Sequence, residues 1–175
     1  MSIKKLNIGK IPKNVTFCLK DNNLNITGQY SNIITPILPG LKFIVTKENF
    51  LVVYYKKNLA NSINVIITKI KNALIGVSSL FHVRLSLVGV GYRFNLNGNV
   101  LSMRIGYNHS VEVPLENNIH CKVITPTEIL LLSNDIDKLV LFASKIRNLK
   151  KPEVYKGKGI RFSTEVVTLK KVQVK

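Results

Sequence analysis

Acidic residues are scarce in this chain of 175 residues. Only 9 aspartates and glutamates stand against 26 lysines and arginines, which gives a formal net charge of +17 at pH 7. A compact domain with this excess of positive charge favours a nucleic acid or an anionic membrane surface as its partner. The carboxylates include no pair placed by a motif for acid–base catalysis, and no nucleophile, base and orienting group come together. We therefore expect no catalytic residue, no small-molecule substrate and no enzyme activity.

Cysteine and histidine are equally few. Cys18 and Cys121 are far apart and outside any Cys-x-x-Cys spacing, which argues against a zinc site and against a disulfide. Among His82, His109 and His120, only His120 adjoins a cysteine, and neighbouring side chains on a strand point to opposite faces. The sequence therefore predicts neither a metal site nor a cofactor.

Long hydrophobic runs are also missing, although 46% of the residues are hydrophobic. A helix needs about 20 consecutive apolar residues to cross a bilayer. The densest apolar stretch, residues 59–80, is interrupted by asparagines and lysines, so a membrane span is excluded. The first ten residues are too short in their apolar part for a secretory signal and form no arginine-rich presequence. We expect the protein to work where it is made or to have been trimmed already.

Cations and glycines are concentrated in one short stretch, residues 150–161, which reads Lys-Lys-Pro-Glu-Val-Tyr-Lys-Gly-Lys-Gly-Ile-Arg. Pro152 ends a helical pattern, while Gly157 and Gly159 allow tight turns and a close approach of the backbone to a partner. The lysine and arginine head groups can reach phosphates, and Tyr155 offers a flat face to a base or a ribose. Charged runs are often plain solvated loops, so the pattern alone leaves both interpretations open.

Two internal matches indicate a duplicated unit. Residues 28–36 and 106–114 each begin at a glycine close to a tyrosine and end at a proline. Residues 68–72, Thr-Lys-Ile-Lys-Asn, match residues 144–148, Ser-Lys-Ile-Arg-Asn, in the same order along the chain. Matches at a nearly constant offset predict two tandem copies of one domain.

We place the joint between the copies near Val77, which gives domains 1–77 and 78–175. Alternating apolar residues and turn signals predict strands in both copies; they are expected at 14–19, 24–27, 33–37, 41–46, 50–55, 82–87, 94–96 and 100–105. The dipeptide Asn97-Gly98 predicts a tight hairpin between the last two strands.

One helix is expected in each copy, because apolar residues recur at helical spacing. The first stripe is Leu59, Ile63, Ile66, Ile67, Ile70 and Leu74, and the second is Ile136, Leu139, Val140, Ala143, Ile146 and Leu149. Asn134 is expected to cap the second helix, and Asp135 and Asp137 fall in its first turn, where the helix dipole favours them. The predicted fold class is α+β: two tandem copies of a small domain, each an antiparallel or mixed sheet packed on one side by a helix.

Residues 87–93, Leu-Val-Gly-Val-Gly-Tyr-Arg, resemble a dinucleotide-binding turn only superficially. The third glycine is missing, and a strand pattern follows where a helix would have to receive the pyrophosphate. The two glycines instead favour a bulge or a close approach of strands.

Three motifs together resemble the large-subunit ribosomal protein L6 family. They are residues 152–161, residues 87–93 and the segment Ile8-Gly9-Lys10-Ile11-Pro12. The resemblance covers essentially the whole chain, strongly over 85–162 and weakly over 13–76, where residues 29–32 lack the family's charged glycine-containing turn. It implies a structural constituent of the large ribosomal subunit, with ribosomal RNA and neighbouring ribosomal proteins as partners. It also implies binding chiefly through the C-terminal domain, near the sarcin–ricin loop and the base of the stalk.

The same resemblance implies which residues face the RNA. They are Lys150, Lys151, Tyr155, Lys156, Gly157, Lys158, Gly159 and Arg161, with Lys170, Lys171 and Lys175 as a basic tail. The composition leaves an alternative open, a non-ribosomal basic protein that binds nucleic acid or an anionic membrane surface. The preference for Asn, Ile and Lys over Ala and Arg is typical of an AT-rich genome. We therefore expect a mitochondrial ribosome, with a plastid or the bacterial cytoplasm as alternatives.

Overall fold

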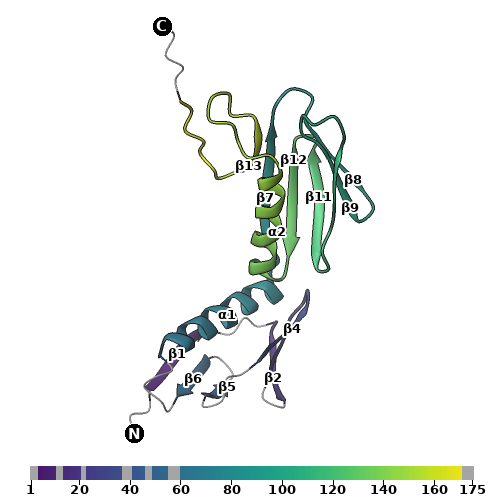
Figure 1. Cartoon of the computed structure of the whole chain (residues 1–175). Helices are drawn as coiled ribbons and strands as arrows, with labels where there is room; N and C mark the ends of the chain where they lie inside the picture. The colour runs from purple at the N-terminus through teal and green to yellow at the C-terminus, as the bar shows by residue number, and fades with distance from the viewer. Residues whose placement is uncertain are drawn as a thin grey trace. The chain divides into compact units, whose positions relative to one another are not determined.

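The computed structural model describes residues 4–10, 14–20, 23–36, 41–45, 49–54 and 60–170. The chain divides into two compact units, Met1–Leu80 and Phe81–Lys175. Each unit combines antiparallel sheets with one helix (Figure 1), which confirms the predicted α+β class. Val77, where the joint was placed, is buried within the helix of the first unit, and the division falls after that helix ends.

The first unit carries two three-stranded sheets ahead of helix α1, Ala60–Ser78. The sheets have the strand orders β2-β3-β4 and β1-β6-β5, and all neighbours are antiparallel. The strands are β1 (Lys4–Lys10), β2 (Thr16–Lys20), β3 (Asn23–Thr27), β4 (Asn32–Pro36), β5 (Leu41–Val45) and β6 (Asn49–Tyr54). All five predicted strands of this copy are confirmed to within two residues where they are described, and β1 was not predicted.

The core of the first unit forms where α1 packs on β3 and β4. Ile66, Ile70 and Leu74 of the predicted stripe are buried, and Ile67 packs half-buried beside them. Residues four apart share one side of a helix, so this stripe covers the sheet. Leu59 and the side chain of Ile63, also predicted for the stripe, lie outside the described residues.

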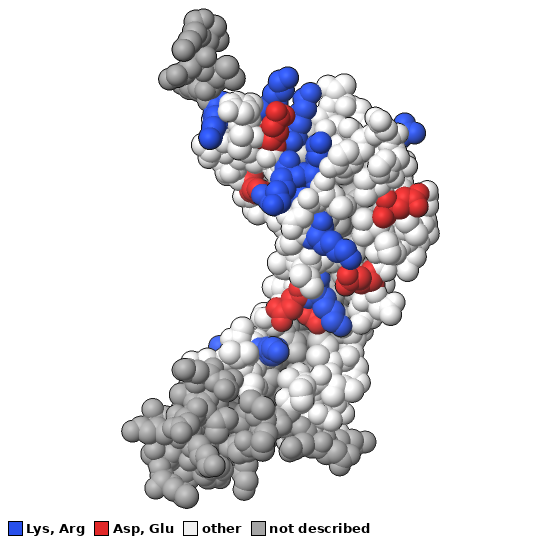
Figure 2. All heavy atoms as spheres, viewed as in Figure 1, with Lys and Arg blue, Asp and Glu red and all other residues white. Residues whose placement is uncertain are grey.

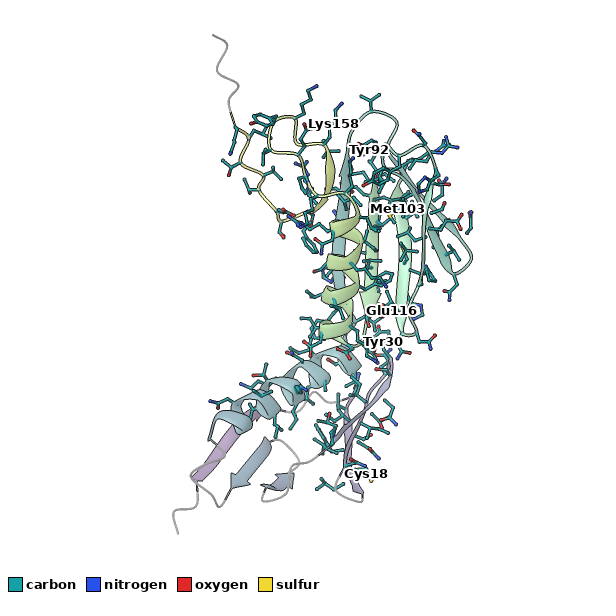
Figure 3. All side chains as sticks on the ribbon, viewed as in Figure 1. Cys18, Tyr30, Tyr92, Met103, Glu116 and Lys158 are labelled. Atoms are coloured by element: carbon teal, nitrogen blue, oxygen red, sulfur yellow. The ribbon has the colours of Figure 1, made fainter. Side chains whose placement is uncertain are left out.

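The second unit carries a four-stranded sheet, order β11-β12-β7-β13, and a three-stranded sheet, order β10-β9-β8. All paired strands are antiparallel. The elements are β7 (Phe81–Val88), β8 (Arg93–Asn97), β9 (Val100–Arg104), β10 (Val111–Pro114), β11 (Ile119–Thr125), β12 (Glu128–Ser133), α2 (Ile136–Leu149) and β13 (Gly159–Phe162). One apolar core joins both sheets to α2, and Met103 lies among its buried side chains (Figure 3).

Helix α2 differs from the prediction at two points. Its N-cap is Asp135 and not Asn134: the Asp135 carboxylate accepts the N–H groups of Asp137 and Lys138 at 3.0 and 3.3 Å. Its buried stripe contains Phe142, which was not predicted, whereas Val140 is 45% exposed. Phe142 follows Leu139 by three residues and so shares its side of the helix, while Val140 is turned about 100° away.

The hairpin between β8 and β9 is confirmed, with its turn one residue later than predicted. Asn97 pairs with Val100, so the loop residues are Gly98, with φ 58°, and Asn99. The glycines of residues 87–93 were expected to mark a bulge or a close approach of strands, but the close neighbour of Gly89 is a side chain: a Cβ at Gly89 would come within 2.8 Å of the Tyr92 ring. The Tyr92 hydroxyl lies against Gly106 in the same way, at 2.7 Å from a Cβ there.

Candidate nucleic-acid interface

Five of the predicted RNA-facing side chains come together in one loop, residues 150–158, which we call the basic loop. Lys151, Tyr155, Lys156 and Lys158 are exposed and Lys150 is half-buried. Figure 2 shows Lys and Arg side chains gathered around the end of α2 and the segment that follows, and Lys158 extends away from the ribbon in Figure 3. Like charges this close repel each other, so the arrangement favours an anionic partner.

The backbone of the basic loop is ordered by its own hydrogen bonds. The N–H of Glu153 donates to the Lys158 carbonyl at 2.9 Å, and the N–H of Gly157 donates to the Glu153 carbonyl at 2.8 Å. The N–H of Ile160 donates to the Lys150 carbonyl at 2.8 Å and closes the loop at its base. Because these bonds hold the loop before any partner arrives, binding loses less conformational entropy.

The two glycines of the predicted site, Gly157 and Gly159, both lie close to other parts of the chain. Gly159 is buried, and it begins β13, a strand that was not predicted. Gly157 is half-buried, and a Cβ there would lie 3.4 Å from the Leu169 side chain. The close backbone approach expected of Gly159 is therefore made within the protein.

Arg161 lies in β13, on the outer face of the four-stranded sheet. Its neighbours Ile160 and Phe162 pack in the core, so the arginine points to the opposite face. There it lies beside Ser86, its cross-strand partner, and diagonal to Arg84. The predicted site residues are thus divided between a loop and a sheet face.

The tail of the chain supports the basic loop where it is described. The N–H of Lys170 donates to the Val154 carbonyl at 2.9 Å, and the Lys170 side chain is exposed. Lys171 and Lys175 lie outside the described residues.

An ion pair attaches this tail to α2. Arg147 binds Glu165 through two hydrogen bonds, one of them from Nε to Oε2 at 2.8 Å, and the Phe162 N–H also donates to Oε2. The hydrogen bonds from Arg147 lower the pKa of the Glu165 carboxyl, and the same contact raises the pKa of Arg147. Both groups are therefore held in their charged forms.

Two aromatic residues beside the basic loop were missed. The Tyr107 hydroxyl donates to the Leu149 carbonyl at 3.0 Å, and the Lys150 ammonium lies 4.8 Å from the centre of the Tyr107 ring. His109 stacks on Tyr107, with ring centres 6.3 Å apart and planes 17° apart. Gly106-Tyr107 belongs to the internal repeat, but only the fold brings the turn next to Lys150.

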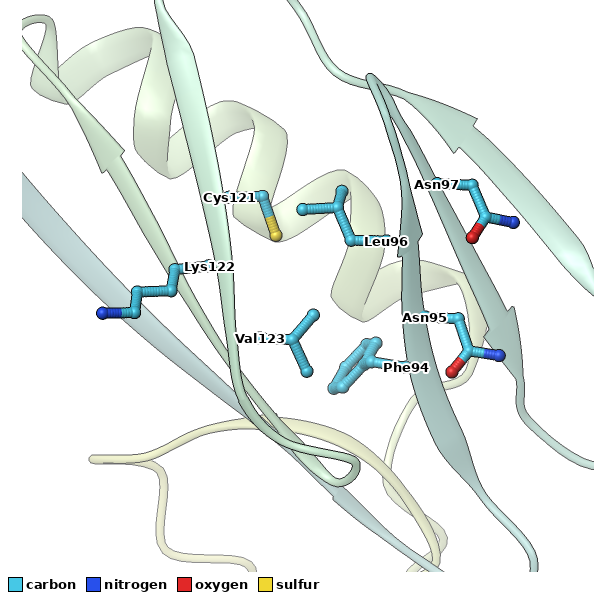
Figure 4. Close-up of a pocket in the computed structure, with 7 residues that line it drawn as sticks. All are labelled: Phe94, Asn95, Leu96, Asn97, Cys121, Lys122 and Val123. Atoms are coloured by element: carbon cyan, nitrogen blue, oxygen red, sulfur yellow. The ribbon is translucent and has the colours of Figure 1, made fainter.

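A pocket of about 430 Å³ opens between β8 and β11 (Figure 4). Phe94, Leu96, Cys121 and Val123 point into it, whereas Lys122 points away. Burial raises the pKa of the Cys121 thiol to about 11, so the thiol is protonated at neutral pH and is a poor nucleophile. The pocket is a gap between two sheet edges, and no charged side chain among the labelled residues points into it.

The residues described above contain no group of three or more His, Cys, Asp or Glu side chains that could hold a metal ion. None of their helices is long and apolar enough to cross a membrane.

Comparison with known proteins agrees with the motifs. The family model for ribosomal protein L6 matches residues 88–163, which include the basic loop. The chain is 34% identical to large ribosomal subunit protein uL6 of Psychrobacter arcticus over 171 residues, 94% of each chain. It is 37% identical to uL6c of Trieres chinensis over 164 residues, 92% of this chain and 91% of the relative. With relatives this similar along nearly its whole length, the chain belongs to the ribosomal protein L6 family.

Proposed function

We propose that the protein is a structural constituent of the large ribosomal subunit and that it binds large-subunit ribosomal RNA chiefly through its second unit. The observation that carries the proposal is the ordered basic loop, which presents Lys151, Lys156 and Lys158 to solvent on a backbone fixed by hydrogen bonds. Lysines placed in this way bind phosphates by charge and release condensed counterions. We further propose that the contacted RNA lies near the sarcin–ricin loop and the stalk base, and that the protein has no enzymatic role.

Titration with salt tests the charge-based part of the proposal. Lys156 and Lys158 are changed together to alanine, and binding to in vitro transcribed large-subunit ribosomal RNA is measured at several salt concentrations. The plot of log affinity against log salt should become less steep by about 0.7 to 0.9 per lost contact. Exposed lysines contribute little to stability, so the melting temperature should stay close to that of the parent.

A matched control removes two exposed lysines at the same spacing from α1, Lys69 and Lys71. This variant loses the same charge and should keep a salt dependence closer to that of the parent. Equal slopes for the parent and the Lys156/Lys158 variant would reject the basic loop as the binding site. Chemical footprinting of the RNA complex should show protection at the sarcin–ricin loop; protection elsewhere would reject that placement.

A mitochondrial location is the last part of the proposal. It is supported by the preference for Asn, Ile and Lys, which is typical of AT-rich genomes. Relatives occur in bacteria such as Psychrobacter arcticus, so the family itself does not decide the compartment. Sequencing the genome that encodes the gene is the test: a plastid or bacterial genome would reject the mitochondrial assignment and leave RNA binding untouched.

Sedimentation of the protein outside ribosomes, with membranes or DNA, would favour the non-ribosomal alternative.

A further inference from the structure

The turn between β9 and β10 exposes two aromatic rings next to the basic loop. All five residues of this turn, 106–110, are exposed, and Tyr107 keeps 47% of its surface accessible. The turn therefore holds two flat side chains that stay accessible beside the lysines of the basic loop. Recognition of single-stranded RNA combines these same two elements.

The position of Tyr107 is fixed from two sides. Its hydroxyl donates to the Leu149 carbonyl, one of the last carbonyl groups of α2, which have no partner within the helix. The Lys150 ammonium lies over its ring at 4.8 Å, within the range of a cation–π contact. Lys150 also accepts the hydrogen bond that closes the basic loop. The turn and the basic loop are therefore attached to the same end of α2.

His109 extends this arrangement outward. Its ring is nearly parallel to that of Tyr107, at 17°, with centres 6.3 Å apart, which is an offset stack. One face of the imidazole is turned toward the phenol ring, and the residue remains exposed. A planar group of suitable size could continue the stack on the other face.

We propose that Tyr107 and His109 form a stacking platform for an unpaired base of the RNA, with Lys150 linking the platform to the basic loop. This proposal rests on the function proposed above and adds a second mode of contact to it. The basic loop attracts phosphates irrespective of sequence, whereas a platform requires a base that is free of its helix. Holding the turn in place would require only the hydrogen bond from the Tyr107 hydroxyl, and it would not explain why His109 stacks on the Tyr107 ring.

Three substitutions distinguish a stacking platform from a purely structural role in holding the turn. For each variant, the affinity for in vitro transcribed large-subunit ribosomal RNA is measured. His109→Ala should weaken binding about 5- to 150-fold, which corresponds to the loss of one stacked base. His109→Phe keeps an aromatic ring at this position, and it should therefore restore most of the affinity that His109→Ala loses. Tyr107→Phe removes the hydrogen bond to Leu149 and keeps the ring, so it should bind nearly as well as the parent. The salt slope of His109→Phe should match that of the parent.

Ultraviolet crosslinking of the unaltered protein to the same RNA gives a test that needs no substitution. A nucleotide should be found attached to the peptide that contains Tyr107 and His109. Parent-like binding by His109→Ala, or binding by His109→Phe as weak as that of His109→Ala, would overturn the platform. Crosslinks confined to the basic loop would also overturn it while leaving the proposed function intact. If RNA binding is weakened in the Lys156/Lys158 variant but unchanged in His109→Ala, the platform is likewise overturned and the proposed function stands.

Discussion

A Cβ atom at Gly159 would lie 2.7 Å from the carbonyl oxygen of Lys151. The backbone of Gly159 also has a φ of 148°, a conformation that side chains with a Cβ rarely adopt. Both facts concern the base of the basic loop, where β13 begins as the chain leaves the lysines. The loop can therefore close without strain only if position 159 has no side chain.

Replacing Gly159 with alanine should lower the free energy of unfolding by roughly 2 to 5 kcal/mol, because backbone strain and a steric clash add together. Chemical denaturation measures this change. Gly91→Ala is the matched control: Gly91 also has a positive φ, 76°, but a Cβ there would meet nothing within 4 Å. The control should lose only about 1 to 2 kcal/mol. Equal losses in the two variants would show that the contact with Lys151 is unimportant.

The Arg147–Glu165 pair should make stability depend on pH. The pKa of Glu165 is lowered in the folded state, chiefly by hydrogen bonds from Arg147, so the unfolded chain binds a proton more readily. This stabilisation is complete above the ordinary glutamate pKa, about 4.3, and is lost as the pH falls through the lower folded value. Glu165→Gln should therefore be less stable than the parent at neutral pH, and the difference should shrink in acid. A difference that is constant between neutral and acidic pH would contradict this account.

Local sequence patterns predicted much of the fold because strands and helices bury one side at a regular spacing. The strands of the first unit and the helix stripe of Ile66, Ile70 and Leu74 were found in this way. β12 was missed because its continuous apolar run, Ile129–Leu132, does not distinguish a strand from a buried helix. β11 could have been found, since Ile119, Cys121 and Val123 alternate with polar residues. β13 could not, because it begins at a glycine and follows a run of lysines.

The candidate interface was predictable only where its residues are neighbours in the sequence. The lysines of the basic loop lie close together in the sequence. The motif that contains them identified both the candidate RNA-binding segment and the resemblance to the family. Tyr107 and His109 precede that loop by some forty residues, and the fold alone places them beside Lys150. The strand that begins at Gly159 was not predicted, because its pairing partner β7 lies far away in the sequence.

Truncating two residues of α2 should change stability in the opposite order to the one that the predicted stripe implies. Phe142 is fully buried between the helix and the sheets, so Phe142→Ala should cost about 3 to 5 kcal/mol of unfolding free energy. Val140 is 45% exposed, so Val140→Ala should change stability by less than about 0.5 kcal/mol. Denaturant titrations of both variants give the comparison. A larger loss for Val140→Ala than for Phe142→Ala would restore the original stripe and reject this placement of α2.

The two units are predicted to fold independently, since each has its own buried cluster. Fragments 1–80 and 81–175 should each unfold cooperatively in thermal melts, and the second fragment should retain RNA binding with the salt dependence of the whole chain. The cut belongs after Leu80, because Val77 is buried and its carbonyl accepts the N–H of Tyr30 at 3.3 Å. A fragment ending at residue 76 would lose both contacts and should melt at a lower temperature than fragment 1–80. Failure of fragment 81–175 to unfold cooperatively would show that its core needs the first unit, and the division into two domains would be wrong.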